Sequence, residues 1–232
     1  MVESTNNLQV SDLATKVRQN VQRIIVGKDD SINLALVAIL CRGHILLEDV
    51  PGIGKTTLSK ALASSLGCNF KRIQCTPDLM PSDVVGVNFF NQKMSEFEFQ
   101  PGPVFSQVVL ADEINRATPR TQSALLEAMQ EQQVTIDGLT MPLPNPFLVL
   151  ATQNPIEMEG TFPLPEAQLD RFMIRMILGY PSASEESDIY VRFELDSALP
   201  EIVAVTNGDE LIQVQSAVQA VKVEDVVRNY VV

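Results

Sequence analysis

The feature that most constrains this chain is a short apolar run that leads into a Pro/Gly loop and then into a helical pattern. The run ends at Leu47, and the loop from Glu48 to Lys55 reads EDVPGIGK. Gly52 and Gly54 allow the backbone to wrap closely around an anion, and the following helix would aim its N-terminal dipole at the same place. Strand, glycine loop, Gly-Lys-Thr and helix are the setting of a phosphate-binding loop. We therefore expect an α/β fold organised around this loop.

The loop residues have separate expected roles. Lys55 is predicted to reach the β- and γ-phosphates as a catalytic residue, and the Thr56 hydroxyl is predicted to hold Mg²⁺. The pattern G-x-x-x-x-G-K-[ST] would place its first glycine at position 49, where this chain has Asp49. If the loop needs a positive φ there, aspartate tolerates it better than most residues. The alternative is an ordinary strand-to-helix turn with Lys55 in solvent. The predicted nucleotide-binding residues of the loop are Val50, Pro51, Gly52, Ile53, Gly54, Lys55, Thr56 and Thr57.

A second apolar run, residues 108–111, ends in the carboxylates Asp112 and Glu113. Such a run is typical of a strand buried on both faces of a parallel sheet, and ligands bind at the carboxyl ends of these strands. Asp112 is predicted to hold Mg²⁺ through water, and Glu113 to polarise the water that attacks the γ-phosphate. Adjacent strand residues point to opposite sides, so the two carboxylates are expected to differ in role. The alternative is that both cap the next helix.

The remaining pattern predicts alternating helices and strands. A first helix is expected to have Ser11 as its N-cap, and a second, running from about Asp30 to residue 43, is apolar almost all round and should be buried. Thr118 and Pro119 are expected to start another helix. The sole histidine, His44, is expected to be a packed structural residue. The other expected elements are strands at 70–75, 147–151 and 173–178, short helices near 77–80 and before residue 171, and hairpins at 85–99 and 134–140.

Two further polar residues follow or precede predicted strands. Asn154 could hydrogen-bond the attacking water or the γ-phosphate, or could be an ordinary turn residue. Arg171 could pair within its own chain or face outward. The hairpin at 85–99 carries several phenylalanines and could either grip a partner or pack on its own domain.

Composition narrows the function classes. The net charge of −12 and the lack of a Lys/Arg cluster argue against an extended nucleic-acid footprint. Cys41, Cys68 and Cys75 have no metal-site spacing and are expected to be buried thiols, which suits a reducing compartment. The N-terminus lacks the features of a signal peptide and no apolar run could span a bilayer, so a cytoplasmic location is expected. The chain stops in mid-pattern at Val232, so a truncated chain is expected.

The motifs together resemble the MoxR branch of the AAA+ ATPases, from about residue 26 to residue 181. The resemblance implies a P-loop NTPase (AAA+) core with a parallel five-stranded sheet between helices, then the start of a small helical lid. It divides the chain into an N-terminal helix (1–25), the core (26–181, with a hairpin insert near 85–99) and the lid (182–232). The matching stretches are residues 43–48, 76–83, 111–117, 122–129, 151–155 and 164–172.

The resemblance also implies roles that the residues alone do not establish. Asn154 falls on the catalytic sensor 1 position, and Arg171 falls on the arginine finger that reaches the nucleotide of a neighbouring subunit. Val26 and Gly27 fall on the segment that lines the adenine pocket. The family uses ATP and Mg²⁺, forms rings that are usually hexamers, and often works with a partner that carries a von Willebrand factor A domain. Its sensor 2 arginine falls beyond the last residue here, so nucleotide binding should survive better than hydrolysis or ring assembly.

We therefore expect an ATPase with a chaperone-like action on partner proteins or complexes. One rival is a nucleic-acid motor of the same superfamily, which the negative charge disfavours. Another is a small-molecule kinase, which Glu113 disfavours because a carboxylate beside Asp112 suits attack by water. A third is a nucleotide-gated scaffold with little turnover.

Overall fold

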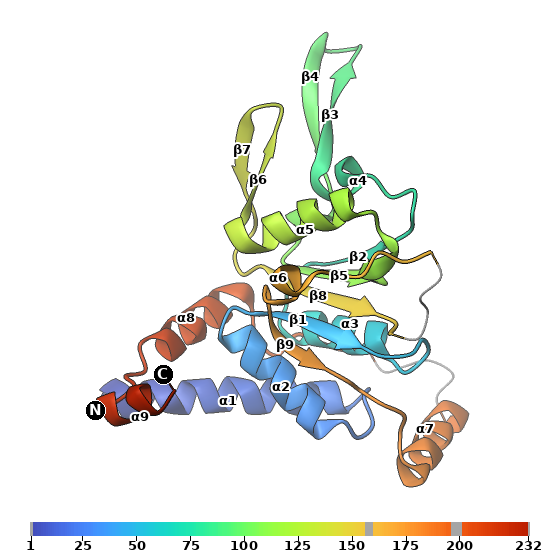
Figure 1. Ribbon diagram of the computed structural model, residues 1–232. Helices are drawn as coiled ribbons and strands as arrows, with labels where there is room; N and C mark the ends of the chain where they lie inside the picture. Colours follow the sequence, from blue (N-terminus) through green and yellow to red (C-terminus); the bar gives the residue numbers. More distant parts are fainter. Residues whose placement is uncertain (1, 156–159, 196–200, 232) are drawn as a thin grey trace.

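The computed structural model describes residues 2–155, 160–195 and 201–231, and a five-stranded parallel sheet lies at its centre (Figure 1). The three inner strands are mostly apolar runs of the kind that both faces of a parallel sheet bury, whereas the two edge strands carry charged, partly exposed residues. This confirms the predicted sheet between helices. The strand order is β2 (Phe70–Gln74), β5 (Val108–Asp112), β8 (Leu148–Gln153), β1 (His44–Glu48) and β9 (Phe172–Met176).

Alternate residues of the central strands enter two separate cores. Leu47 and Leu110 pack on one side of the sheet, whereas Leu46 and Val109 pack on the other. This alternation follows from the two-residue period of a strand. The first side is covered by α1 (Val2–Gln22), α2 (Asp29–Leu40), α3 (Lys55–Ser65) and α8 (Gly208–Gln219), and the second by α4 (Pro81–Val85) and α5 (Pro119–Glu131).

His44 connects the sheet to α5. Its Nδ1 accepts a hydrogen bond from the Val149 N–H at 3.0 Å, and its Nε2 lies 3.2 Å from the Met129 carbonyl, to which it donates. The ring also makes an edge contact with Phe147. Both ring nitrogens are therefore used structurally, and burial lowers the pKa of His44.

Replacing His44 by alanine should destabilise the fold strongly. Each buried backbone group left without a partner costs about 1–3 kcal/mol. The change would leave two such groups unpaired, the Val149 N–H and the Met129 carbonyl. Wild-type stability should also decrease as the pH falls below about 6.5, because the unfolded histidine binds a proton more readily than the buried one. Urea unfolding of both proteins at several pH values tests this. His44 is the sole histidine. If the free energy of unfolding changed equally between pH 7 and pH 6 in wild type and in the alanine variant, the buried His44 would not be the cause of the pH dependence.

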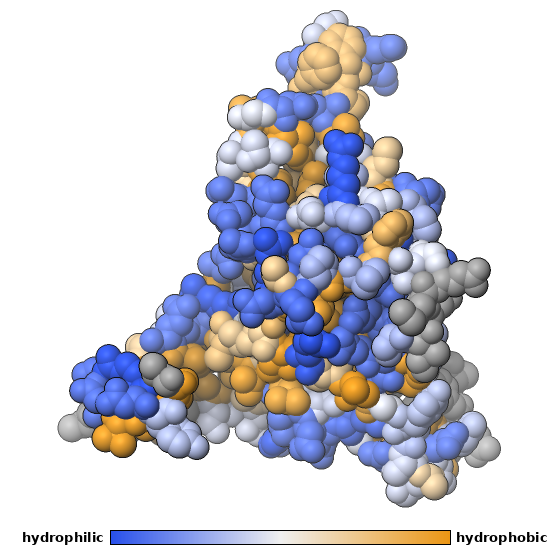
Figure 2. Space-filling model, in the orientation of Figure 1, coloured by the Kyte–Doolittle hydropathy of each residue, from blue (hydrophilic) through white to orange (hydrophobic). Residues whose placement is uncertain are grey.

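Two hairpins project from the core beyond α5 (Figure 1). One pairs β3 (Gly86–Asn91) with β4 (Glu96–Pro101), and the other pairs β6 (Gln133–Ile136) with β7 (Leu139–Pro142). The Asn88 side chain donates to the Asp137 carboxylate at 2.7 Å, so the hairpins are tied together. Apolar side chains are visible among polar ones at the tip of the first hairpin (Figure 2). Its exposed apolar residues are Val87, Phe89, Phe90, Met94 and Phe97.

The chain after β9 is helical. It forms α7 (Ala183–Leu195), α8 and α9 (Asp225–Val231), and Leu211 and Val214 of α8 enter the same core as α1 to α3. The remaining short elements are the 3₁₀ turns η1 (Pro103–Phe105) and η2 (Ile114–Arg116), and the helix α6 (Glu166–Leu169). The terminal Val232, on which the expected truncation rested, lies outside the described residues. None of the helices in the described ranges has both the length and the apolar content needed to cross a bilayer.

Several local predictions were wrong. The first helix starts at Val2 rather than after Ser11, because no proline or glycine interrupts residues 2–11. The short helix starts at Pro81 rather than near 77, since proline fits the first helical turn but not the interior. There the Asp83 carboxylate accepts the Met80 N–H at 2.9 Å. The second helix is not buried all round, and its exposed apolar residues are Leu34 and Val37. Cys41 is exposed rather than buried.

Candidate functional site

The glycine loop leaves open space where an anion would bind. Gly52 and Gly54 have φ of 86° and 92°, and a Cβ on either would meet no heavy atom within 4 Å. Gly54 is also the N-cap of α3, and no side chain caps the helix there. The first N–H groups of α3 are therefore not capped from within the loop, which is the arrangement that binds phosphate at a helix N-terminus.

Lys55 is turned back onto its own loop. Its Nζ donates to the Asp49 carbonyl at 2.7 Å, and the residue is buried. Burial lowers the pKa of Lys55, and the carboxylates of Asp112, Asp49 and Glu113 act in the opposite sense. The ammonium group therefore has one weakly basic partner, a carbonyl, that a phosphate oxygen can replace.

The structure corrects the expectation for Asp49. Asp49 is not among the described residues with positive φ, so no left-handed conformation has to be tolerated there. Its carboxylate accepts the N–H of Val50 at 2.9 Å and the N–H of Gly179 at 2.7 Å. The side chain thus fastens the start of the loop to the segment that follows β9, a task that glycine could not perform.

The two carboxylates at the end of β5 face the same hollow, which corrects the prediction that they point to opposite sides. Asp112 is the last strand residue, but Glu113 has a φ of 58° and has left the strand. Strand alternation therefore does not apply to Glu113. The Thr152 hydroxyl donates to Asp112 Oδ1 at 2.6 Å and accepts the Glu113 N–H at 2.8 Å. Thr152 thereby fixes both residues relative to β8.

The hollow between the loop and these carboxylates has a volume of about 370 Å³. It brings together residues of the glycine loop and both carboxylates, which were predicted to share one site. Arg72 and Gln74 also line it, and both were missed. They are two residues apart on β2 and so share one face, which is the signal that could have found them. The full lining is Pro51, Gly52, Gly54, Lys55, Thr56, Thr57, Arg72, Gln74, Asp112 and Glu113.

Other predicted site residues lie outside this lining. Val50 and Ile53 belong to the loop, but Ile53 packs against the core. Val26 and Gly27 lie in the turn between α1 and α2. A Cβ on Gly27 would overlap the Glu185 carboxylate of α7, so this turn lies directly against the segment that follows the sheet.

Asn154 and Arg171 also lie outside the lining of the hollow. Asn154 directly follows β8 and is buried. Arg171 directly precedes β9, and β9 runs parallel to β1 with Phe172 beside His44. Arg171 therefore lies at the opposite end of the sheet from the glycine loop, roughly 15 Å away by the length of β1. None of the described residues forms an ion pair with Arg171.

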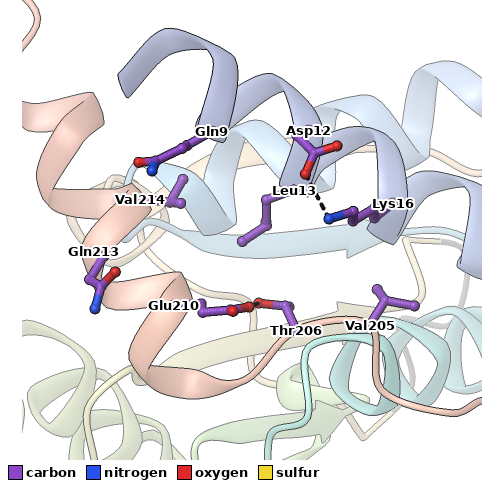
Figure 3. Close-up of a pocket in the computed structure, with 9 residues that line it drawn as sticks. All are labelled: Gln9, Asp12, Leu13, Lys16, Val205, Thr206, Glu210, Gln213 and Val214. Carbon is purple, nitrogen blue, oxygen red and sulfur yellow. Dashed lines mark hydrogen bonds and ion pairs between the residues drawn. The ribbon is translucent and has the colours of Figure 1, made fainter. Parts of the chain in front are cut away.

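A second hollow of about 180 Å³ lies between α1 and α8 (Figure 3). Four of its polar side chains form two pairs: Lys16 pairs with Asp12 at 2.7 Å, and Thr206 donates to Glu210 at 2.6 Å. Leu13 and Val214 form its apolar floor. Among the described residues, its lining contains no glycine, and each of its two carboxylates is held by one of these pairs.

The donor chemistry of the first hollow fits Mg²⁺ together with a nucleoside triphosphate. Hydroxyl and carboxylate oxygens are available from Thr56 and Asp112, and Mg²⁺ is commonly bound by one or two carboxylates plus substrate phosphates. No group of three or more His, Cys, Asp or Glu in the described part of the chain could hold a metal by itself. This donor set therefore suits a metal that arrives with a nucleotide.

Comparison with known proteins gives a consistent result. Residues 44–174 match the family model of the ATPases associated with various cellular activities (AAA). The protein YeaC of Bacillus subtilis is 53% identical over 220 residues, which cover 95% of this chain and 69% of YeaC. Chaperone MoxR1 of Mycobacterium tuberculosis is 47% identical over 212 residues, covering 91% of this chain and 56% of MoxR1. The crystal structure of a proposed ATPase from Cytophaga hutchinsonii superposes with a TM-score of 0.87 at 41% identity, covering 98% of this chain and 70% of that one.

Proposed function

The chain belongs to the MoxR family of AAA ATPases, and from this premise we propose that it hydrolyses ATP in order to remodel or mature partner proteins. One observation carries the nucleotide part of the proposal. An open backbone cradle, a buried lysine and the two carboxylates at the end of β5 line a single hollow. A phosphate-binding loop and an acidic strand end in this arrangement form the common core of ATP-hydrolysing sites.

The roles follow from the chemistry of each group. The loop N–H groups and Lys55 would bind the phosphates, and Glu113 would accept a proton from the attacking water. The water oxygen bonds to the γ-phosphorus as the bond to the bridging oxygen breaks, which releases ADP and phosphate. Thr56 and Asp112 would hold Mg²⁺, which when bound neutralises charge on the phosphates. Asn154 is proposed to orient the water, and Val26 and Gly27 to contact the adenine.

Replacing Glu113 by glutamine should preserve nucleotide binding and lower ATP turnover by about 10²–10⁴-fold, the usual contribution of a general base. Glutamine has the same shape, but its amide cannot take the proton. Phosphate release and isothermal titration calorimetry measure the two properties separately. Glu127→Gln, which changes an exposed carboxylate on α5, is the matched control. Near wild-type turnover by Glu113→Gln would move the base role to another residue.

The projecting hairpins support the partner part of the proposal. The β3–β4 hairpin holds five large apolar side chains in solvent, with Phe97 73% exposed and Met94 63% exposed. Exposed apolar clusters of this kind usually mark contact surfaces. We propose that this hairpin contacts the client, that the subunits form a hexameric ring, and that a protein with a von Willebrand factor A domain assists.

The domain organisation belongs to the same proposal. We propose three parts: the N-terminal helix (1–25), the core (26–181) and the lid (from 182). The boundary between core and lid lies in the segment that follows β9. Asp49 and Lys28 both hold that segment, through the Gly179 N–H at 2.7 Å and the Tyr180 carbonyl at 2.8 Å.

Affinity capture with Glu113→Gln in the presence of ATP tests the partner proposal, because the trapped state should retain its client. Equal recovery of every bound protein with and without ATP would argue against an ATP-driven remodeller.

A further inference from the structure

Arg72 holds the carboxylate that is proposed to bind Mg²⁺. Its Nε and Nη2 donate to the same oxygen, Asp112 Oδ2, at 3.0 and 2.6 Å. The other oxygen, Oδ1, accepts the Thr152 hydroxyl at 2.6 Å. A carboxylate oxygen has about two lone-pair sites. Arg72 therefore saturates Oδ2, and a metal-bound water could use that oxygen only after the guanidinium moves away.

The same guanidinium also determines the orientation of Gln74. Arg72 Nη2 donates to Gln74 Oε1 at 2.5 Å, which leaves the amide nitrogen of Gln74 to donate to Glu113 Oε2 at 3.0 Å. If Arg72 left, the Gln74 amide would lose the donor that fixes which of its ends faces Glu113. One side chain thus connects the two carboxylates that were assigned separate roles.

A simple surface ion pair does not explain this arrangement. The Asp112 side chain is only 11% exposed, and Arg72 approaches it with two donors rather than one. Both Arg72 and Gln74 line the hollow. The neighbouring cation on β2, Lys71, is exposed and makes no ion pair with any described residue.

We propose that Arg72 is a positioning residue that occupies Asp112 until a metal ion replaces it. The inference rests on the proposed function and adds a regulation of the same site. Before the metal binds, Arg72 neutralises Asp112. When Asp112 turns to the metal, Arg72 is displaced from Oδ2.

The coupling to the metal is tested by Mg²⁺ titrations of the binding of a fluorescent ADP analogue, which needs no turnover. Arg72→Ala removes the group that competes with Mg²⁺ for Asp112. The Mg²⁺ concentration that gives half of the full gain in affinity for the analogue should therefore fall about three- to tenfold. This factor corresponds to the loss of one charged hydrogen bond, reduced because Arg72 is partly exposed. The Mg²⁺ requirement of Arg72→Lys should lie between those of wild type and Arg72→Ala, because lysine keeps the charge but loses the paired donors. Lys71→Ala, which removes a charge from the same strand, should behave as wild type.

The outcomes separate the inference from the function on which it rests. If wild type does not bind the analogue, the proposed function fails. If wild type binds but Arg72→Ala has an unchanged or higher Mg²⁺ requirement, or an effect matched by Lys71→Ala, the inference fails. Loss of nucleotide binding by Arg72→Ala at every Mg²⁺ concentration would also overturn it, because Arg72 would then be a phosphate ligand.

Discussion

Replacing Arg171 by alanine should leave nucleotide binding intact and lower ATP turnover by about 10³–10⁵-fold, the range associated with arginine fingers. The reason is where the residue lies. Arg171 precedes β9 at the end of the sheet opposite the glycine loop, so it cannot reach its own phosphate site without a large movement. A planar guanidinium that reaches a neighbouring subunit could neutralise charge on that subunit's γ-phosphate.

The competing explanation for Arg171 is a local ion pair with Asp170. Such exposed pairs contribute about 0–1 kcal/mol to stability and nothing to turnover. Asp170 is exposed, and the ion pairs among the described residues do not include one between Asp170 and Arg171. The geometry therefore leaves the guanidinium available for a contact outside its own chain.

A mixing experiment distinguishes the two explanations. Arg171→Ala subunits retain a sound site but cannot serve the next one, whereas Glu113→Gln subunits have an inactive site and an intact Arg171. Mixing the two should restore some of the ATPase activity that each lacks alone. Normal turnover by Arg171→Ala, or inactivity of mixed rings whose composition is verified by mass spectrometry, would rule out a role in trans.

The elements nearest the site were the most predictable from the sequence. The runs at β1, β5 and β8 are apolar because both faces of the sheet are buried, so each could be located without knowing its neighbours. Thr118 and Pro119 predicted the start of α5 from local chemistry alone. The Thr118 hydroxyl caps the helix, and Pro119 lacks the N–H that the first helical residue does not need. Such signals depend only on residues close in the chain.

Features that depend on distant contacts could not be predicted. Arg72 and Gln74 became part of the site only because β2 pairs with β5 in a register that sets Gln74 beside Asp112. Asp49 was interpreted as a tolerated substitute for glycine, since its bond to Gly179 joins positions 130 residues apart. Both Asp112 and Glu113 face the hollow because of one left-handed residue, which strand alternation does not predict.

Replacing Lys55 by alanine should reduce ATP affinity by about 10²–10⁴-fold, which corresponds to the loss of about two charge-assisted hydrogen bonds. Lys55 is buried at the loop, and its bond to the Asp49 carbonyl holds it beside the cradle that Gly52 and Gly54 leave open. No other lysine lines the hollow among the described residues, and Arg72, the other cation of the lining, reaches it from β2 and not from the loop. Lys60→Ala changes an exposed lysine of the same helix and serves as the matched control.

Isothermal titration of ATP with Mg²⁺ into wild type, Lys55→Ala and Lys60→Ala tests most directly whether this hollow is the nucleotide site. Wild type and Lys60→Ala should bind ATP with equal affinity, and Lys55→Ala should give no saturable heat at concentrations that saturate the other two. Equal binding of ATP by folded Lys55→Ala, with urea unfolding unchanged, would contradict the assignment of the glycine loop as a phosphate-binding loop.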